Sequence, residues 1–346
     1  MSPRLGRAAL AVLAGVWPLS GCYLLESAAG QIELTNKEQP ISQVLADPDT
    51  SPALRHELTE VRDIREFASA ELKLPDNGSY KSYADLGRRY VVWNVYAAPE
   101  FSVEPKTWCF PFVGCVAYRG YFDELQAQRY AYQLRQQGYD VLVGGVAAYS
   151  TLGHFHDPVL NTMLGWDESE LAAIIFHELA HQLLYLPGDS AFNEAFATTV
   201  EREGVRRWLA RQGRPVDEKE FASRDRRARE VAKLVAQARS RLKALYSSDL
   251  RPGELRAAKV AEFDRVRAEY VALPGAESGY AWLFGPDLNN AALSSLATYY
   301  DCVPGFEARL KAVDGDLPRF YAAARALAQQ PAEARHAQLC AEGSNQ

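Results

Sequence analysis

The chain has 346 residues, of which 48% are hydrophobic, 24% charged and 11% aromatic. This composition supplies a buried core and excludes an intrinsically disordered protein, a collagen, a coiled-coil rod and a multi-span membrane protein. Lys and Arg number 38 against 44 Asp and Glu, so the formal charge is −6. Because there is no basic excess to neutralise a phosphate backbone, nucleic acid is not expected as a partner.

The first residues resemble an export signal. Arg4 and Arg7 precede an uncharged stretch at residues 8–21, which is shorter than the roughly 20 residues that span a bilayer. The stretch leads into L-S-G-C at residues 19–22, which resembles the lipobox of bacterial lipoproteins. We therefore expect residues 1–21 to be removed and a lipid on Cys22 to attach the protein to the membrane; an ordinary secretory signal or a short buried helix is the alternative.

The residue after the cysteine bears on location. Tyr23 stands where an inner-membrane retention signal has aspartate, so the chain resembles a lipoprotein of the bacterial outer membrane that faces the periplasm. Removing residues 1–21 takes away two arginines and no acidic residue, which makes the mature chain more acidic.

Four further cysteines agree with export. Cys109, Cys115, Cys302 and Cys340 are an even number and allow three pairings in an oxidising compartment. The simplest arrangement joins Cys109 to Cys115 as a local clip and leaves Cys302 to pair with Cys340. Four free buried thiols are the alternative.

The expected helices and strands together predict an α+β protein. A polar tether is expected at residues 22–51 and the main folded core at residues 52–215. Within the core, helical composition occurs at residues 53–74 and 123–137. Runs rich in β-branched and aromatic residues predict strands at residues 90–96, 115–118 and 140–149.

The second half is mainly helical. Asp167 can cap a helix whose apolar run ends near Leu186, before Pro187-Gly188, and a second helix is expected from Ser190 to about Arg211. Residues 216–273 carry charges of both signs and apolar residues at helical spacing, which predicts a long helical hairpin projecting from the core. Residues 274–346 are expected to complete the core with further helices.

The first of these helices contains the pattern H-E-x-x-H at residues 177–181. Histidines at positions i and i+4 project from one helical face and can share a metal ion at about 2.1 Å per bond. Glu178, one position further round, can reach a metal-bound water and take its proton. The alternative is a core helix that happens to hold two histidines, but burying two imidazoles and a carboxylate without a partner is costly. The pattern therefore predicts a zinc ion held by His177 and His181.

The third ligand follows from a resemblance. The pattern with a third histidine is excluded, because Leu184 and Pro187 occupy the positions of its glycine and histidine. The segment N-E-A-F-A at residues 193–197 instead resembles the N-E-x-F-A segment of the gluzincin metallopeptidases, which implies that Glu194 is the third ligand. The spacing from His181 to Glu194 is shorter than in those families, and Glu201 is the alternative ligand or a partner of an imidazole N–H.

Several segments together resemble the bacterial family of predicted aminopeptidases, which are lipoprotein-type zinc metallopeptidases. The resemblance implies a zincin-like fold with a small mixed sheet, an active-site helix pair and the helical hairpin as an insertion. The segments that carry it are residues 90–95, 109–121, 149–153, 157–158, the helix pair around His177 and Glu194, and residues 289–299.

The oxyanion of the intermediate needs a donor besides the metal. Tyr299 is the first candidate, by loose analogy with the tyrosine of aminopeptidase-N-like enzymes, and Tyr149 is the second. Residues 149–153 could also be an edge strand that pairs with an extended peptide. His154 and His156 could line the cleft, bind a second metal, or form an exposed loop pair.

The sequence thus predicts a zinc-dependent peptidase of the cell envelope, most simply an aminopeptidase, with Glu178 as general base. Two alternatives remain: an envelope quality-control endoprotease, and a scaffold lipoprotein whose zinc is structural. A structural site would have no need of Glu178, and its fourth position would be closed by a residue such as His154 or His156.

Overall fold

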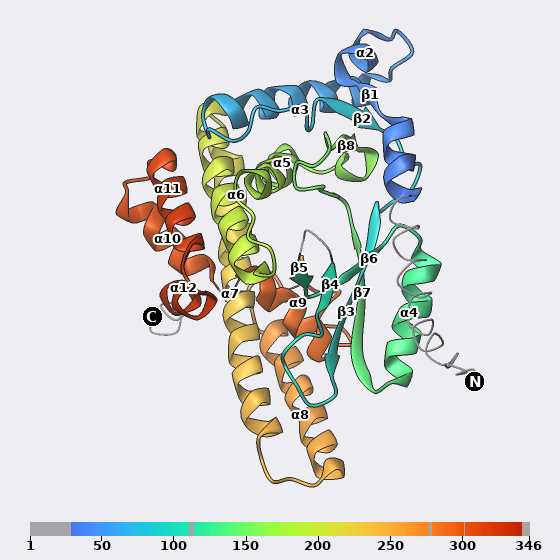
Figure 1. The fold of residues 1–346 in the computed structure, drawn as a ribbon, viewed down its shortest axis with the longest axis vertical. Helices are drawn as coiled ribbons and strands as arrows, with labels where there is room; N and C mark the ends of the chain where they lie inside the picture. The colour runs from blue at the N-terminus through green and yellow to red at the C-terminus, as the bar shows by residue number, and fades with distance from the viewer. Residues whose placement is uncertain (1–28, 111–113, 277–278, 301, 341–346) are drawn as a thin grey trace, which may run out of the picture.

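The computed structural model describes residues 29–340 apart from residues 111–113, 277–278 and 301 and the side chains of residues 298–300. The protein is an α+β structure in which helices predominate over three small sheets (Figure 1). The predicted class is therefore confirmed, although the strands form separate small sheets. The signal segment and Cys22 lie outside the described residues.

The largest sheet is antiparallel and has the order β6-β3-β7. A second sheet, β1-β2-β8, is mixed, because β2 runs antiparallel to β1 and parallel to β8. Strands β4 and β5 form a separate hairpin. The strands are β1 (Gln39–Pro40), β2 (Ser82–Ala84), β3 (Val92–Pro99), β4 (Trp108–Phe110), β5 (Gly114–Val116), β6 (Arg119–Tyr121), β7 (Tyr139–Val146) and β8 (Val159–Leu160).

The helices surround these sheets. Residues 29–37 are helical, and a 3-10 turn follows β8 at Asn161–Met163. The labelled α-helices are α2 (Ile41–Ala46), α3 (Pro52–Ala70), α4 (Glu124–Gln136), α5 (Glu168–Leu183), α6 (Ser190–Gln212), α7 (Pro215–Tyr246), α8 (Pro252–Val271), α9 (Asn290–Tyr300), α10 (Val303–Ala312), α11 (Leu317–Ala328) and α12 (Ala332–Leu339). Within the described residues, no helix is long and apolar enough to cross a bilayer.

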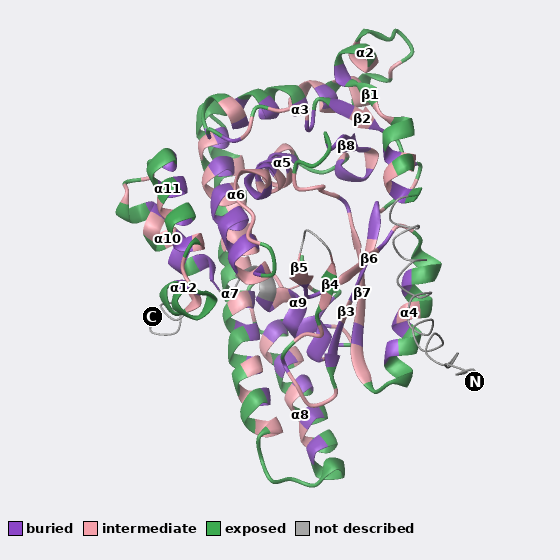
Figure 2. Cartoon of the chain, in the orientation of Figure 1, coloured by how far each residue is buried: buried purple, intermediate pink, exposed green. Residues whose placement is uncertain are grey.

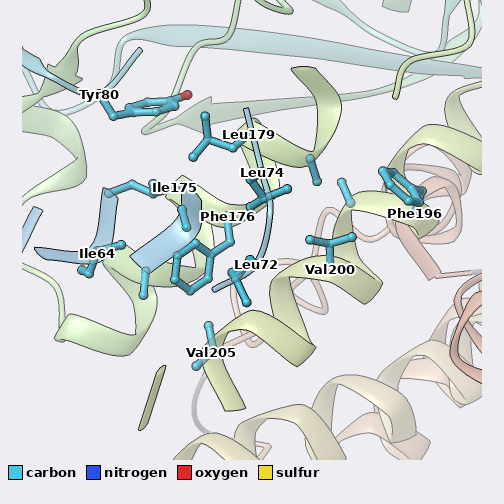
Figure 3. Packing of buried hydrophobic residues seen from close by; sticks show 14 of the residues in the cluster. Ile64, Leu72, Leu74, Tyr80, Ile175, Phe176, Leu179, Phe196, Val200 and Val205 are labelled. Carbon is cyan, nitrogen blue, oxygen red and sulfur yellow. The ribbon is translucent and has the colours of Figure 1, made fainter. Parts of the chain in front are cut away.

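The main hydrophobic core lies around α5 and α6. Side chains from α3, from the loop that follows it and from α5 and α6 meet there, among them the fully buried Ile64, Phe176 and Phe196 (Figure 3). Burying one such side chain contributes about 1.5–3 kcal/mol. Helices α10–α12 lie on the side of α6 away from the large sheet (Figure 1). This packing fixes α5 and α6 rigidly, and these are the two helices that carry the predicted metal ligands.

The predicted hairpin is formed by α7 and α8. Their connecting loop lies at the end of the molecule opposite α3 (Figure 1), and residues 247–254 are all exposed (Figure 2). Most of the hairpin does not project freely, however, because Leu234, Phe263 and Leu293 belong to one buried cluster that joins α7, α8 and α9. The hairpin therefore packs on α9 and forms part of the folded body.

Two boundaries differ from expectation. Residues 29–51, assigned to a tether, contain helix and the short strand β1, and Leu34 and Ile41 lie in the main core. Their apolar side chains are too few to give a clear period in the sequence, but they suffice to dock the segment. The helix expected to Leu74 ends at Ala70, where Lys73 adopts a φ of 58° and turns the chain.

Both simplest cysteine pairings are present. Cys109 is bonded to Cys115 across the β4–β5 hairpin, and Cys302 is bonded to Cys340. The second bridge joins the residue before α10 to the residue that follows α12. Both are consistent with the expectation of an oxidising compartment.

Candidate metal centre

Helix α5 begins and ends by local signals. Asp167 caps it as expected, because its carboxylate accepts the backbone N–H groups of Ser169 and Glu170. The helix ends at Leu183, three residues before the predicted end, since Leu184 is extended. Ile175, Phe176 and Leu179 face the core, which turns His177, Glu178 and His181 to the other side.

A tight turn brings α6 back along α5. The Asp189 side chain caps α6 at the Phe192 N–H, and the Asn193 amide bonds both the N–H and the carbonyl of Leu186 at 2.8 Å. The short spacing between His181 and Glu194 is accommodated by this turn. Glu194, in the first turns of α6, therefore comes to lie against the two histidines of α5.

His177, His181 and Glu194 form a group that could hold a metal ion, with ligand atoms all within 4.8 Å of one another. The Nε2 atoms of the two histidines are 3.1 Å apart, and Glu194 Oε2 lies 3.2 Å from His177 Nε2 and 3.6 Å from His181 Nε2. Tetrahedral ligands at 2.0–2.1 Å from a zinc ion are about 3.3–3.4 Å apart. The three atoms thus have the separations that a tetrahedral cation requires, as the sequence predicted.

Glu201, the alternative ligand, has a different place. Its Oε2 lies 2.9 Å from His177 Nδ1, on the opposite edge of the ring from the metal group. A carboxylate in this position fixes the ring orientation and leaves Nε2 free to bind a cation. Glu201 therefore matches the second role considered for it, as the partner of an imidazole N–H.

The electrostatics of the group favour positive charge. Burial favours the neutral ring of His177, but Glu194 and Glu201 hold its pKa well above the ordinary value. Burial also opposes ionisation of Glu194, yet the charge of His181 and the hydrogen bond with His177 lower the pKa of Glu194 to about 2. The Nδ1 atom of His181 is buried and has no partner among the described residues.

Two cavities meet at this group. The larger, of about 1220 Å³, is bounded by helix 29–37, the β6-β3-β7 sheet, residues 146–155, α5 and the start of α6. The smaller, of about 490 Å³, lies between α5, α6 and α7. His177 and Glu178 line both, as do Val146 and Ala148. Glu178 therefore lies beside the metal group at the junction of the two cavities.

The described lining of the larger cavity is mostly apolar and aromatic by area and contains no Lys or Arg. Its acidic residues are Glu178 and Glu194. Its aromatic lining residues are Phe110, Tyr118, Phe122, Tyr149, Phe155 and Tyr185. Such walls suit uncharged, apolar side chains of a ligand.

The predicted tyrosines fall in different places. Tyr149 lines the larger cavity, and its ring packs edge-on against Phe122 at 5.2 Å between centroids. The side chain of Tyr299 lies outside the described residues. Residues 149–151 have no regular secondary structure and residues 152–153 form a turn, so the predicted edge strand is wrong there. The reason is Asp157, whose buried carboxylate binds the Thr151 N–H and hydroxyl and curls the segment back.

Sequence reasoning missed two further tyrosines of the cavity. Tyr185 follows His181 by four residues, and their rings are 6.3 Å apart. Burial, and next the charge of Glu194, raises the pKa of Tyr118 well above the ordinary value, so this phenol stays protonated. The Tyr118 hydroxyl makes no hydrogen bond to a residue that the structure describes. Tyr118 lies in a segment that carried the family resemblance, which was the available signal.

The other histidines do not join the group. His154 and His156 are exposed on the loop before β8, and only His154 lines the larger cavity. Among the described residues, the metal group contains no fourth histidine, cysteine or carboxylate. This arrangement matches the exposed loop pair considered in the sequence.

Comparison with protein families identifies the chain. A family described as "Putative aminopeptidase" matches residues 22–339, which is most of the sequence, and the chain belongs to this family. The comparisons with curated proteins and with solved structures found no match. The family membership predicted from the sequence segments is thus confirmed.

Proposed function

We propose that this protein is a zinc-dependent peptidase that trims peptides from their amino end at the bacterial cell envelope. The observation that carries the proposal is the three-residue metal group, with Glu178 beside it, at the junction of two cavities. Membership of the aminopeptidase family supports the amino-terminal direction. Peptides are therefore the proposed substrate class.

The residues divide the chemistry between them. Zinc held by His177, His181 and Glu194 would act as a Lewis acid towards the peptide carbonyl and the attacking water. Glu178 takes the proton of that water and passes it to the leaving amine. Glu201 holds the His177 ring in place through Nδ1.

Tyr118 is the oxyanion donor that the geometry favours. It lines the larger cavity with Glu178 and Glu194, and its protonated hydroxyl has no competing hydrogen bond within the described residues. A donor that is already in place at the developing negative charge lowers the barrier without reorganisation. Tyr149, on the same cavity, is the second candidate.

The zincin-like core is proposed from the arrangement of two helices and a small sheet around the metal group. A helix with H-E-x-x-H is followed by a second helix that returns with the glutamate, and both lie beside a small sheet. Strand β7 is one of the two edge strands of that sheet in the described structure, and its last residue, Val146, lines both cavities. An extended peptide beside this edge would run from one cavity into the other.

Envelope attachment remains a proposal as well. It rests on the lipobox-like segment that ends at Cys22 and on the two disulfides. Helix 29–37 contributes Gln31 and Ile32 to the wall of the larger cavity. Because Cys22 precedes this helix by only a few residues, a lipid on Cys22 would hold the cavity close to the outer-membrane surface.

The scaffold alternative fits the site less well. A structural zinc site has four protein ligands, whereas three of the described residues converge here, next to a carboxylate that does not bind the metal. The endoprotease alternative uses the same catalytic group and differs only in that the peptide would extend through both cavities beyond the metal group.

The decisive experiment compares zinc-loaded protein with its Glu178→Gln variant on a mixed peptide pool, analysed by mass spectrometry. We expect N-terminal trimming by the unaltered protein alone, with equal zinc content and equal thermal stability in the two proteins. Glu168→Gln, which changes the same helix away from both cavities, is the matched control. Equal absence of cleavage in both zinc-loaded proteins would contradict a peptidase.

A further inference from the structure

The smaller cavity follows helix α5 away from the catalytic carboxylate. Glu170, Ile174 and Glu178 line it, and these residues are spaced four apart on one face of the helix. Beyond Glu170 the cavity reaches α7. There Arg224 contacts Asp167 and the Ser169 hydroxyl, and its Nη1 lies 3.4 Å from Glu170 Oε1. Arg224 thus lies beside Glu170 at the end of the cavity that is far from Glu178.

The charges of this cavity are not fully balanced. Arg202 is paired with Asp225 and Glu307, so it is not available to a ligand. Arg224 alone faces two carboxylates, Asp167 and Glu170. Burial, followed by the charge of Asp167, raises the pKa of Glu170 even though Arg224 opposes the shift. A further cation beside Glu170 would therefore be stabilised.

The walls between the two ends combine apolar side chains with the polar Thr198, Glu201 and Asp225 of α6 and α7. Ala173 and Ile174 come from α5, Phe221 and Ala228 come from α7, and Trp166 precedes α5. Apolar side chains of a ligand would pack on them, while a positive group would be attracted to the Glu170 end. The ligand that combines these features, and whose other end must reach Glu178, is the free amino end of a peptide.

On the basis of the proposed peptidase function, we propose that the smaller cavity holds the amino-terminal end of the substrate, with Glu170 binding its ammonium group, and that the enzyme releases dipeptides. The length follows from the helix. Eight residues separate Glu170 from Glu178, a rise of about 12 Å at 1.5 Å per residue. Contacts of about 3 Å at each end leave about 6 Å, which is two residues of extended chain at about 3.3 Å each.

The direction of the bound peptide follows from a comparison of the two cavities. The larger cavity takes the remainder of the peptide, since it has the greater volume and no Lys or Arg among its described lining to bind a terminal carboxylate. The carboxylates at the far end of the smaller cavity would repel such a terminus. N-terminal acetylation of the substrate would remove the charge that Glu170 binds.

The test uses the zinc-loaded full chain and an apolar decapeptide with a free, an acetylated or a carboxyl-amidated end. We expect successive loss of dipeptides from the free and the amidated peptide, and a loss of at least about 100-fold in kcat/KM on acetylation. Glu170→Gln should lower kcat/KM for the free peptide about 10- to 100-fold, because a charge-assisted bond is lost. Glu168→Gln, in the same helical turn and outside the cavity, should leave it unchanged. Arg224→Ala should open the far end and lengthen the released products.

Binding provides a readout that does not depend on turnover. Calorimetric titration of the Glu178→Gln protein with free Leu-Leu should give binding that acetylation of the dipeptide or a second change, Glu170→Gln, weakens at least about 10-fold. Release of single residues, internal cleavage, equal cleavage of acetylated peptide, or no effect of Glu170→Gln would overturn the dipeptide assignment while leaving a peptidase. Absence of all hydrolysis with zinc bound would overturn the proposed function, and the titration would still decide the subsite.

Discussion

The buried ion pair of Asp189 with Arg335 gives the sharpest stability prediction. Asp189 stands in the turn between the two metal-site helices, and its Oδ2 accepts Arg335 Nη2 at 2.5 Å and Nε at 2.9 Å. Both side chains are only 6% exposed. Asp189→Asn would leave the Arg335 guanidinium buried without its counter-charge, which typically costs about 3–5 kcal/mol. Asparagine still caps α6, so the loss comes from the pair and not from the cap.

Equilibrium urea unfolding at neutral pH, with the disulfides oxidised, measures this loss. Asp189→Asn combined with Arg335→Met should recover most of it, because the unpaired charge is then gone. Glu254→Gln, in an exposed pair with Arg251, is the control and should leave the urea midpoint unchanged. A loss below about 1 kcal/mol for Asp189→Asn, or a double variant as unstable as the single one, would refute the reasoning.

The same ion pair predicts how the stability of the fold changes with pH. Burial opposes ionisation of Asp189, but the bonds from Arg335 and His336 hold its pKa below the usual range. A lowered folded-state pKa contributes stability above the unfolded value of about 3.9, and that stability is lost as the pH falls through the folded value. The difference in unfolding free energy between the protein and Asp189→Asn should therefore shrink in acid.

Three further outcomes are expected. Tyr118→Phe should lower kcat about 100-fold with little change in KM, since the hydroxyl acts on the oxyanion; steady-state kinetics measure this, and an unchanged kcat would transfer the role to Tyr149. Glu201→Gln should weaken zinc binding about 10- to 100-fold in competition with a chelator, because the His177 ring loses its charged partner; equal affinity would contradict that role. Burial raises the pKa of Asp157 to about 6, so it favours the folded state below about pH 4 and this contribution, about 3 kcal/mol, is lost as the pH rises to 6. Urea unfolding should show the trend, and Asp157→Asn should abolish it.

Local signals predicted the centre of the site well. The cap at Asp167 and the i and i+4 histidines both act within a few residues of one helix. Such interactions depend on neighbouring positions, so a single sequence contains them. The position of Glu194 needed the family resemblance, because its place depends on how tightly the turn at Asp189 closes.

Contacts between distant segments were not predictable in the same way. Asp189 is 146 residues from Arg335, and no periodicity links them. Tyr118 reaches the cavity from a loop beside β6, and residues 29–37 form a wall that the sequence assigned to a tether. Which tyrosine among many faces a cavity depends on the packing of several elements, and each residue on its own favours a core position equally well.

The place where each cavity ends distinguishes an aminopeptidase from an endoprotease. In the proposed peptidase, H-E-x-x-H would determine where hydrolysis takes place, and the surface beyond it would decide whether a chain can pass through or must begin there. In this structure Arg224 on α7 meets the first turn of α5 through Asp167 and Glu170, so the hairpin borders the smaller cavity two helical turns from Glu178. On the proposed function, an insertion that packs on the core in this way would limit how far a bound chain extends beyond Glu178. The length of chain between Glu170 and Glu178 would then set the size of the released product, because the substrate ammonium would be held beside Glu170.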